Sequence, residues 1–350
     1  MKKAAYFRAV LVCTIFLFCS LSTAQEMLQG GQGQFHSIDY SANATMERGD
    51  RIHIVSTNYL SGQIKVGTHN ENQAVFKFRK LVKVGDKTTA IDYADVIEVS
   101  LQTSGSGLNL YLQTPNPAPW SGTDNSGRID GSLLIPEGCE VEFEAIYFDV
   151  EMEGVFKSVK NRSSFGRMNI SGVNGELDIS TSNRDISARN IKGEISISGS
   201  YADIVVQDIE SIGPAAYIRN ENGNISLSDF TGAFDVRNDF GRIKIDDAVL
   251  TDDRSRIRGS YSPIRVSIAG MMDAGLTIRN NNEDIEIIVP VESSADYSLK
   301  VEGSGEINAE GLTIIPTYVD YNRLDFKTGD GESRVRVSAG GKGNIAISGY

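Results

Sequence analysis

The second part of the chain repeats itself at intervals of 18 to 22 residues, beginning near residue 152. Each repeat opens on a glycine and continues with alternating apolar and polar residues, as in Gly175-Glu-Leu-Asp-Ile, Gly193-Glu-Ile-Ser-Ile, Gly232-Ala-Phe-Asp-Val and Gly275-Leu-Thr-Ile-Arg. Alternation with a period of two is typical of a β-strand, and no helical pattern intervenes. A strand-only repeat of this length predicts a β-solenoid, in which each coil of the chain stacks on the coil before it.

The repeats also predict which side chains face the core. One coil offers Leu177 and Ile179, a corner at 183–184, and then Ile186 and Ala188. The matching inward residues of other coils are Ile195, Ile197, Ile204 and Val206; Ala216, Ile218, Ile225 and Leu227; Phe234, Val236, Ile243 and Ile245; and Leu276, Ile278, Ile285 and Ile287. Glycines such as Gly166, Gly175, Gly193, Gly223 and Gly241 are expected at corners with positive φ. The predicted fold is all-β, a single-stranded parallel β-solenoid or β-helix, and right-handed because parallel crossovers almost always are.

The first third of the chain has no clean period. It contains alternating runs that predict strands, such as 51–55, 74–78 and 108–112, and one short helix within 86–97. A polar break at 115–131 holds the only tryptophan, Trp120. We therefore predict a signal peptide at 1–24, a flexible leader at 25–34, a β-rich N-terminal cap at 35–135 and solenoid repeats at 136–350. If the protein assembled with itself through its end coils, the last strand, 343–350, would be an uncapped edge.

The N-terminus has the pattern of a secretory signal. Lys2, Lys3 and Arg8 precede an apolar stretch from Ala9 to Leu21, and small residues stand before Gln25. The apolar stretch is too short for a membrane-spanning helix, which needs about 20 residues. Lipidation of Cys13 or Cys19 is disfavoured, because each follows a large apolar residue rather than a small one. We expect an exported protein that is periplasmic, on the outer cell surface or secreted, with no transmembrane segment after cleavage.

The charge of the chain disfavours one class of partner. Removal of residues 1–24 leaves 31 Lys and Arg against 46 Asp and Glu, a net charge of −15. Such a chain would repel the phosphates of nucleic acid at long range, so we expect no nucleic-acid partner. Cys139 is then the only cysteine, so no intrachain disulfide is possible, and a structural thiol is the expected role.

Several short motifs resemble those of a known family. They are Ser61-Gly-Gln-Ile-Lys-Val, Val75-Phe-Lys-Phe, Leu134-Ile-Pro-Glu-Gly and turns such as Asn222-Gly-Asn-Ile and Asp239-Phe-Gly-Arg-Ile. Over most of residues 45–350 the chain resembles a large bacterial family of exported β-solenoid proteins, the putative adhesins of unknown function. The resemblance implies an adhesin-like role and supplies no catalytic residue and no cofactor. Corners such as 183–185 and 282–284 depart from the family pattern, because they lack the expected glycine.

A row of arginines is the candidate binding site. Arg219, Arg237, Arg258 and Arg279 each follow the second inward residue of a coil, so they should stack on one outer face, about one strand spacing apart. Guanidinium groups bind carboxylate, sulfate or phosphate with two parallel hydrogen bonds, which predicts an anionic ligand. The alternative is a solvated face whose charges are offset by Glu221, Asp235 and Asp239.

Two other rows admit a structural explanation. Asn220, Asn238 and Asn280, with Thr181 at the matching place, are expected to form a hydrogen-bonded ladder along the coils. Two trios, Glu140, Glu142 and Glu144, then Asp149, Glu151 and Glu153, could bridge calcium. Charge that prevents edge-to-edge aggregation explains these carboxylates as well, and we expect no metal site.

These features predict a non-catalytic exported protein of the cell envelope or surface, an adhesin-like binding scaffold without a cofactor. Its partner would be an envelope or extracellular glycan or protein. One alternative is a carbohydrate-active β-helix enzyme that acts on a polysaccharide, for which 246–247 and 252–253 offer the nearest paired carboxylates. Another is a structural envelope protein that assembles with itself through its end coils.

Overall fold

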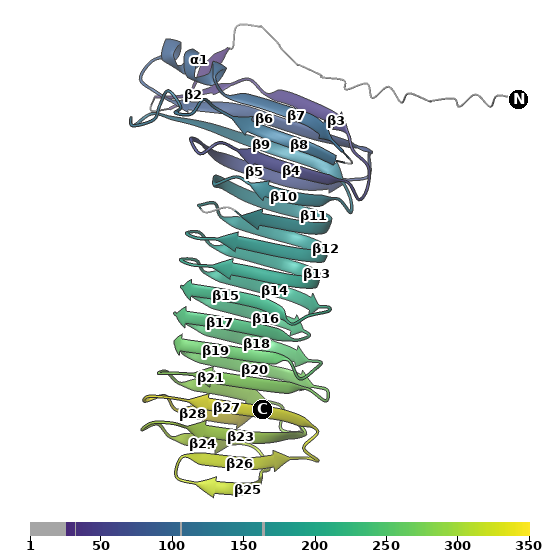
Figure 1. The fold of residues 1–350 in the computed structure, drawn as a ribbon, viewed down its shortest axis with the longest axis vertical. Helices are drawn as coiled ribbons and strands as arrows, with labels where there is room; N and C mark the ends of the chain where they lie inside the picture. The colour runs from purple at the N-terminus through teal and green to yellow at the C-terminus, as the bar shows by residue number, and fades with distance from the viewer. Residues whose placement is uncertain (1–25, 32, 106, 163–164) are drawn as a thin grey trace, which may run out of the picture.

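The computed structural model describes residues 26–31, 33–105, 107–162 and 165–350. They form a tall stack of strands with the N-terminal elements at one end, as Figure 1 shows. The expected signal peptide, 1–24, lies outside the described residues. Within the described ranges no helix is long and apolar enough to span a membrane.

One long sheet, here called the first face, runs the length of the stack. Its strands pair in parallel from coil to coil. In stacking order it contains β8 (Gly107–Gln113), β4 (Arg51–Ser56), β10 (Glu140–Glu144), the second halves of β11 (Tyr147–Arg162), β12 (Met168–Thr181) and β13 (Ile186–Gly199), then β15 (Ala216–Asn222), β17 (Phe234–Phe240), β19 (Ser255–Tyr261), β21 (Gly275–Asn280), β27 (Ser333–Ala339) and β23 (Ala295–Val301).

A second face lies opposite the first and is also built of parallel strands. It contains β9 (Ser126–Pro136), β5 (Leu60–His69), the first halves of β11, β12 and β13, then β14 (Ile204–Ser211), β16 (Ile225–Thr231), β18 (Ile243–Leu250), β20 (Ile264–Met271), β22 (Ile285–Val289), β28 (Ile345–Gly349) and β24 (Ile307–Glu310). The predicted all-β fold with parallel coils is confirmed, and the right-handed sense of the coil stays a prediction.

The core consists of apolar columns that run along the stack. Ile197, Ile218, Val236, Ile257 and Ile278 follow one another in register on the first face and are all buried. Every inward residue that the repeats predict is buried, which confirms the predicted phase. The coils also have a short third side, which the inward positions predicted from the repeats do not include. Its inward residues are Phe156, Val173, Ile191, Ile209 and Phe230.

The corners combine glycine with side chains that hold the next coil. Gly241 has φ +110°, and an added Cβ would lie 2.1 Å from the Gly223 carbonyl oxygen. At corners without glycine, an aspartate side chain holds the next coil. The Asp185 side chain accepts a hydrogen bond from the backbone N–H of Asp203 (3.2 Å), and Asp284 accepts one from Asn344 (2.8 Å). These acids therefore join neighbouring coils where the sequence lacks the expected glycine.

Antiparallel strands close the N-terminal end of the stack. β6 (Gln73–Lys83) pairs antiparallel with β9, and also with β2 (Gln34–Ser37) and β3 (Tyr40–Thr45). β7 (Glu98–Ser104) pairs antiparallel with β8, and β1 (Met27–Gln29) with β2. The expected helix is present as α1 (Lys87–Asp95), with Asp86 at its N-cap. The two faces include β4, β5 and β8, which precede residue 136, and β9, which ends at it. The domain boundaries stay predictions.

The C-terminal strand is not at the edge of the stack, so it is not the uncapped edge that self-assembly through the end coils would use. β28 pairs with β22 on one side and with β24 on the other, and β27 lies likewise between β21 and β23. Figure 1 shows these yellow strands inserted between coils that precede them in the sequence. The end of the first face is a hairpin of β25 (Ile315–Asp320) and β26 (Arg323–Thr328), which pairs antiparallel with β23.

Candidate ligand-binding face

The four predicted arginines lie in register on the first face. Arg219 is opposite Arg237, Arg237 is opposite Arg258, and Arg258 is opposite Arg279, so they occupy four successive strands about 4.8 Å apart. The same column continues toward the N-terminus through Ser198 and Ser180 to Arg162. We call Arg219, Arg237, Arg258 and Arg279 the arginine row. Their outward direction follows from the alternation that buries Ile218, Val236, Ile257 and Ile278.

Carboxylates neutralise three members of the arginine row. Arg219 pairs with Glu221 (3.7 Å), Arg237 with Asp239 (3.4 Å) and Arg258 with Asp235 (3.2 Å). These are three of the acids that the sequence offered as counter-charges. Within the described residues, Arg279 has no carboxylate oxygen within 4.0 Å. A hydrogen bond from Lys300 lowers the pKa of the Glu302 carboxyl, and the nearby charge of Arg279 lowers it further.

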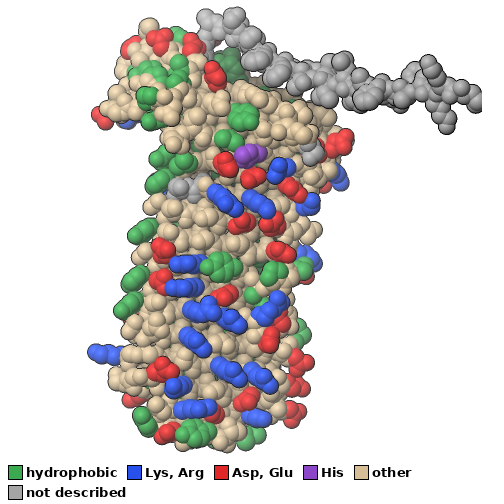
Figure 2. All heavy atoms as spheres, viewed as in Figure 1, with side chains coloured by type: hydrophobic (Ala, Val, Ile, Leu, Met, Phe, Trp, Pro, Cys, Tyr) green, Lys and Arg blue, Asp and Glu red, His purple; other side chains and the backbone are tan. Residues whose placement is uncertain are grey.

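The insertion of β27 adds arginines that the repeats do not reveal. Arg336 lies opposite Thr277, which lies opposite Arg256, and Arg334 lies opposite Gly275. Arg256, Arg334 and Arg336 are exposed and, in the part of the chain that the structure describes, have no carboxylate within 4.0 Å. We call Arg256, Arg279, Arg334 and Arg336 the arginine cluster. Figure 2 shows rows of Lys and Arg side chains over the coils below the cap, with Asp and Glu among them.

Aromatic side chains stand at one end of the first-face strands. Phe240 and Tyr261 are in register at the ends of β17 and β19. Their rings stack with centroids 5.3 Å apart and an interplanar angle of 3°, yet they are 51% and 54% exposed. Tyr201 lies in the same column, because it pairs with Asn222 and Asn222 pairs with Phe240. The sequence analysis did not single out this column, whose members are spaced irregularly along the chain.

The amide row is buried and holds the corners of the coils. The Nδ2 groups of Asn220, Asn238 and Asn280 donate to the backbone carbonyls of Ala202 (2.7 Å), Gly223 (2.8 Å) and Ser262 (2.9 Å). The prediction that these side chains bond to one another in a ladder is therefore wrong, because each amide donates to a backbone carbonyl. Gly259 interrupts the column between Asn238 and Asn280, so a continuous ladder could not form. The role is structural, as the general use of asparagine at turns suggests.

Replacing the buried Asn238 by leucine should destabilise the protein by about 1–3 kcal/mol, because the partly buried Gly223 carbonyl would lose its donor. Chemical denaturation of the variant and the wild type measures the difference. Asn308→Leu is the matched control, since Asn308 is exposed and bonds only to Glu310 on its own strand. Equal losses in the two variants would contradict the structural role of the inward amide.

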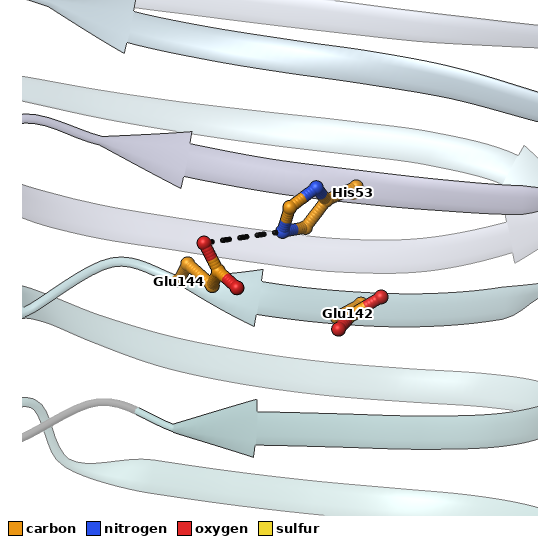
Figure 3. Close-up of side chains that lie close together, drawn as sticks. All are labelled: His53, Glu142 and Glu144. Carbon is orange, nitrogen blue, oxygen red and sulfur yellow. Dashed lines mark ion pairs between the residues drawn. The ribbon is translucent and has the colours of Figure 1, made fainter. Parts of the chain in front are cut away.

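The first carboxylate trio is engaged by basic side chains of the neighbouring strands. Glu140 pairs with Lys157 (2.6 Å), Glu142 with Arg51 (3.7 Å) and Glu144 with His53 (3.6 Å). In Figure 3, His53 points from β4 toward Glu144 on β10, with Glu142 beside them. Ligand atoms of these three residues lie within 4.8 Å of one another, so the group could hold a divalent cation. Arg51 competes with a cation for Glu142, which favours ion pairing as the role of the trio. Of the second trio, Glu151 pairs with Lys65 (2.7 Å).

The single cysteine of the described chain is inert. Cys139 is fully buried, and its thiol donates to the Glu47 carbonyl (3.2 Å). Burial raises the pKa of Cys139 to about 11, so the reactive thiolate is scarce at neutral pH. This setting fits the structural thiol that the sequence analysis expects.

The first pair of aspartates lies within β18, where its register shifts, and the second pair lies in the turn before β19. Asp247 has φ +56°, a left-handed conformation at this irregularity of the strand, and its neighbour Asp246 pairs with Lys244. Asp252 pairs with Arg254, and this hydrogen bond lowers the pKa of the Asp252 carboxyl. A carboxylate held ionised in this way is a poor general acid, which an acid/base hydrolase would need. A pocket of about 360 Å³ lies away from these aspartates, and its lining includes Ser61, Arg128, Tyr147, Asp149 and Arg184.

Comparisons with known proteins give only distant similarity. No protein-family model and no curated protein matches the sequence. A putative adhesin from Parabacteroides merdae is 9% identical, over 88% of this chain and 95% of its own, with a TM-score of 0.31. A putative cell adhesion protein from Clostridium sporogenes is 10% identical, over 89% and 100%, with a TM-score of 0.23. A putative adhesin from Bacteroides fragilis is 11% identical, over 88% and 96%, with a TM-score of 0.20. Values this low carry no argument, so membership of the adhesin family stays a prediction.

Proposed function

We propose that this protein is a non-catalytic, exported scaffold of the cell envelope or cell surface, adhesin-like in its role, that binds an anionic partner through its first face. The coil would be right-handed, and the signal peptide would be removed on export. The observation that carries the proposal is the alignment of Arg219, Arg237, Arg258 and Arg279 on successive strands. A rigid sheet presents these groups without the loss of conformational freedom that a flexible segment would suffer on binding.

The chemistry of the face supports binding rather than turnover. One aspartate of each predicted pair, Asp246 and Asp252, is engaged by a basic neighbour. A regular surface that repeats every coil suits a partner that also repeats, such as a glycan chain with regularly spaced charges. Guanidinium groups would meet its carboxylates or sulfates in pairs of hydrogen bonds.

The test is a binding screen with the purified protein. Immobilised polygalacturonate, heparin and neutral dextran are compared at low and physiological salt. We expect retention on the two acidic polymers, weakened by salt because screening reduces the attraction between exposed charges. Dextran should not retain the protein. Equal behaviour on all three surfaces would refute an anionic partner for this face.

Self-assembly is a second candidate function, favoured by the hairpin at the C-terminal end. In the described residues β25 pairs only with β26, and Val319 on it is 68% exposed. A free strand edge can pair with a second copy of the chain. Pro316 removes one donor from that edge, which weakens the case. Particles that grow with protein concentration, and that Val319→Lys abolishes, would identify this function.

A further inference from the structure

We propose that the arginine cluster of β19, β21 and β27, Arg256, Arg279, Arg334 and Arg336, is a binding site for an acidic polysaccharide. The proposal rests on the proposed function and locates it on the first face. It moves the centre of the site away from Arg219 and Arg237, toward the coils that the C-terminal strands complete. The site exists only because β27 lies between β21 and β23.

The charge balance distinguishes the arginine cluster from the rest of the face. Arg219, Arg237 and Arg258 each have a carboxylate within 3.7 Å, so an incoming anion must displace it. No such partner lies within 4.0 Å of a member of the cluster in the described residues. The acids near the cluster include Asp235, in register with Arg256, Asp296, in register with Arg334, and Glu302, near Arg279. Asp235 is already engaged by Arg258, so the local charge stays positive.

The spacing of the cluster matches a polymer better than a small ion. Arg256 and Arg336 lie on strands two places apart, about 10 Å, with Arg279 on the strand between them. Arg334 and Arg336 are two residues apart on one strand, about 7 Å. Four guanidinium groups spread over three strands therefore address several anionic groups at once, whereas a single phosphate would contact one or two of them.

The neighbouring aromatic rings favour a sugar over other polyanions. Tyr261 ends the strand that carries Arg256, about 17 Å further along, and Phe240 stacks on it. These exposed rings offer an apolar surface to the non-polar face of a sugar ring. An extended peptide would seek a free strand edge, but β19, β21 and β27 are each paired on both sides.

Two triple variants with the same change of charge test the site. The cluster variant is Arg256→Gln/Arg334→Gln/Arg336→Gln. The matched control is Arg189→Gln/Arg242→Gln/Arg265→Gln, which removes three exposed arginines that are not part of the first-face strands. Affinity for polygalacturonate and heparin is measured by titration. Polyglutamate and a single-stranded oligonucleotide serve as polyanions that are not polysaccharides. We expect about a tenfold or greater loss in the cluster variant and a loss of about threefold or less in the control.

Each outcome decides a separate question. If the wild type binds neither acidic polysaccharide, the proposed function and the site fail together. If it binds and the control variant loses as much affinity as the cluster variant, the function stands and the location is wrong. Equal or tighter binding of polyglutamate would indicate an acidic protein partner. Equal binding of the oligonucleotide would indicate a general polyanion surface. Either result would overturn the proposal that the ligand is a polysaccharide.

A second measurement does not depend on how the variants fold. Phenylglyoxal modifies exposed arginines of the wild type, and mass spectrometry locates the modified residues. Saturating polysaccharide should protect Arg256, Arg334 and Arg336 and leave Arg219 accessible. Protection of Arg219 with continued modification of the cluster would overturn the assignment.

Discussion

Ile245→Asp is expected to destabilise the coils around β18 by about 4 kcal/mol or more. Ile245 is fully buried and lies in register between Leu227 and Val266, so the carboxylate would enter a dry column with no partner. The lost packing of the isoleucine adds to the cost. Denaturant unfolding measures the change in free energy. Hydrogen exchange should show the loss of protection concentrated in β16, β18 and β20, because each coil contacts mainly its neighbours.

Val205→Asp is the matched control for this prediction. Val205 lies on the same face of the coil stack, in β14, but its side chain points outward and is 46% exposed. The same change there should alter stability by no more than about 0.5 kcal/mol. If Ile245→Asp melted like the wild type, the assignment of inward and outward residues would be wrong throughout the repeats.

Deleting residues 333–350 is expected to detach the whole C-terminal end of the stack. The deletion removes β27 and β28, which join β23 and β24 to β21 and β22. It also removes the buried side chains of Val335, Val337, Ile345 and Ile347, each of which contributes about 1.5–3 kcal/mol through burial. Limited proteolysis should then cut within 290–332, while coils up to β20 stay protected.

The comparison for the truncation is deletion of Tyr350 alone. This residue is 60% exposed and its backbone bonds to Val289 and Val291, but β27 and β28 stay in place without it, so its loss should leave the proteolytic pattern of 290–332 unchanged. A terminal strand at the edge of the stack would unravel without affecting β23 to β26. Persisting protection of 290–332 after removal of 333–350 would therefore contradict the inserted position of β27 and β28.

The candidate site was predicted in part. The arginine row follows from counting positions within the repeat, since the same outward position recurs from Arg219 to Arg279. The arginine cluster does not follow, because Arg334 and Arg336 lie more than fifty residues beyond Arg279 and could have belonged to any later coil. The ion pairs that set the two groups apart also depend on side-chain positions. Asp235 pairs with Arg258 on the next strand rather than with Arg237 on its own.

The sequence by itself determined the repeat and its phase. Alternation with a period of two decides which side chains face the core, and the burial of Leu177, Ile197 and Ile245 follows from it without knowledge of the fold. Tertiary structure alone decided the order of the last coils. A strand with two apolar residues on its inner side fits equally well against any coil of the same shape, so local pattern could not specify that β28 lies between β22 and β24. The antiparallel hairpin of β25 and β26 covers the end of the first face beyond β23. The final strands, β27 and β28, lie inside the stack between strands that precede them in the sequence.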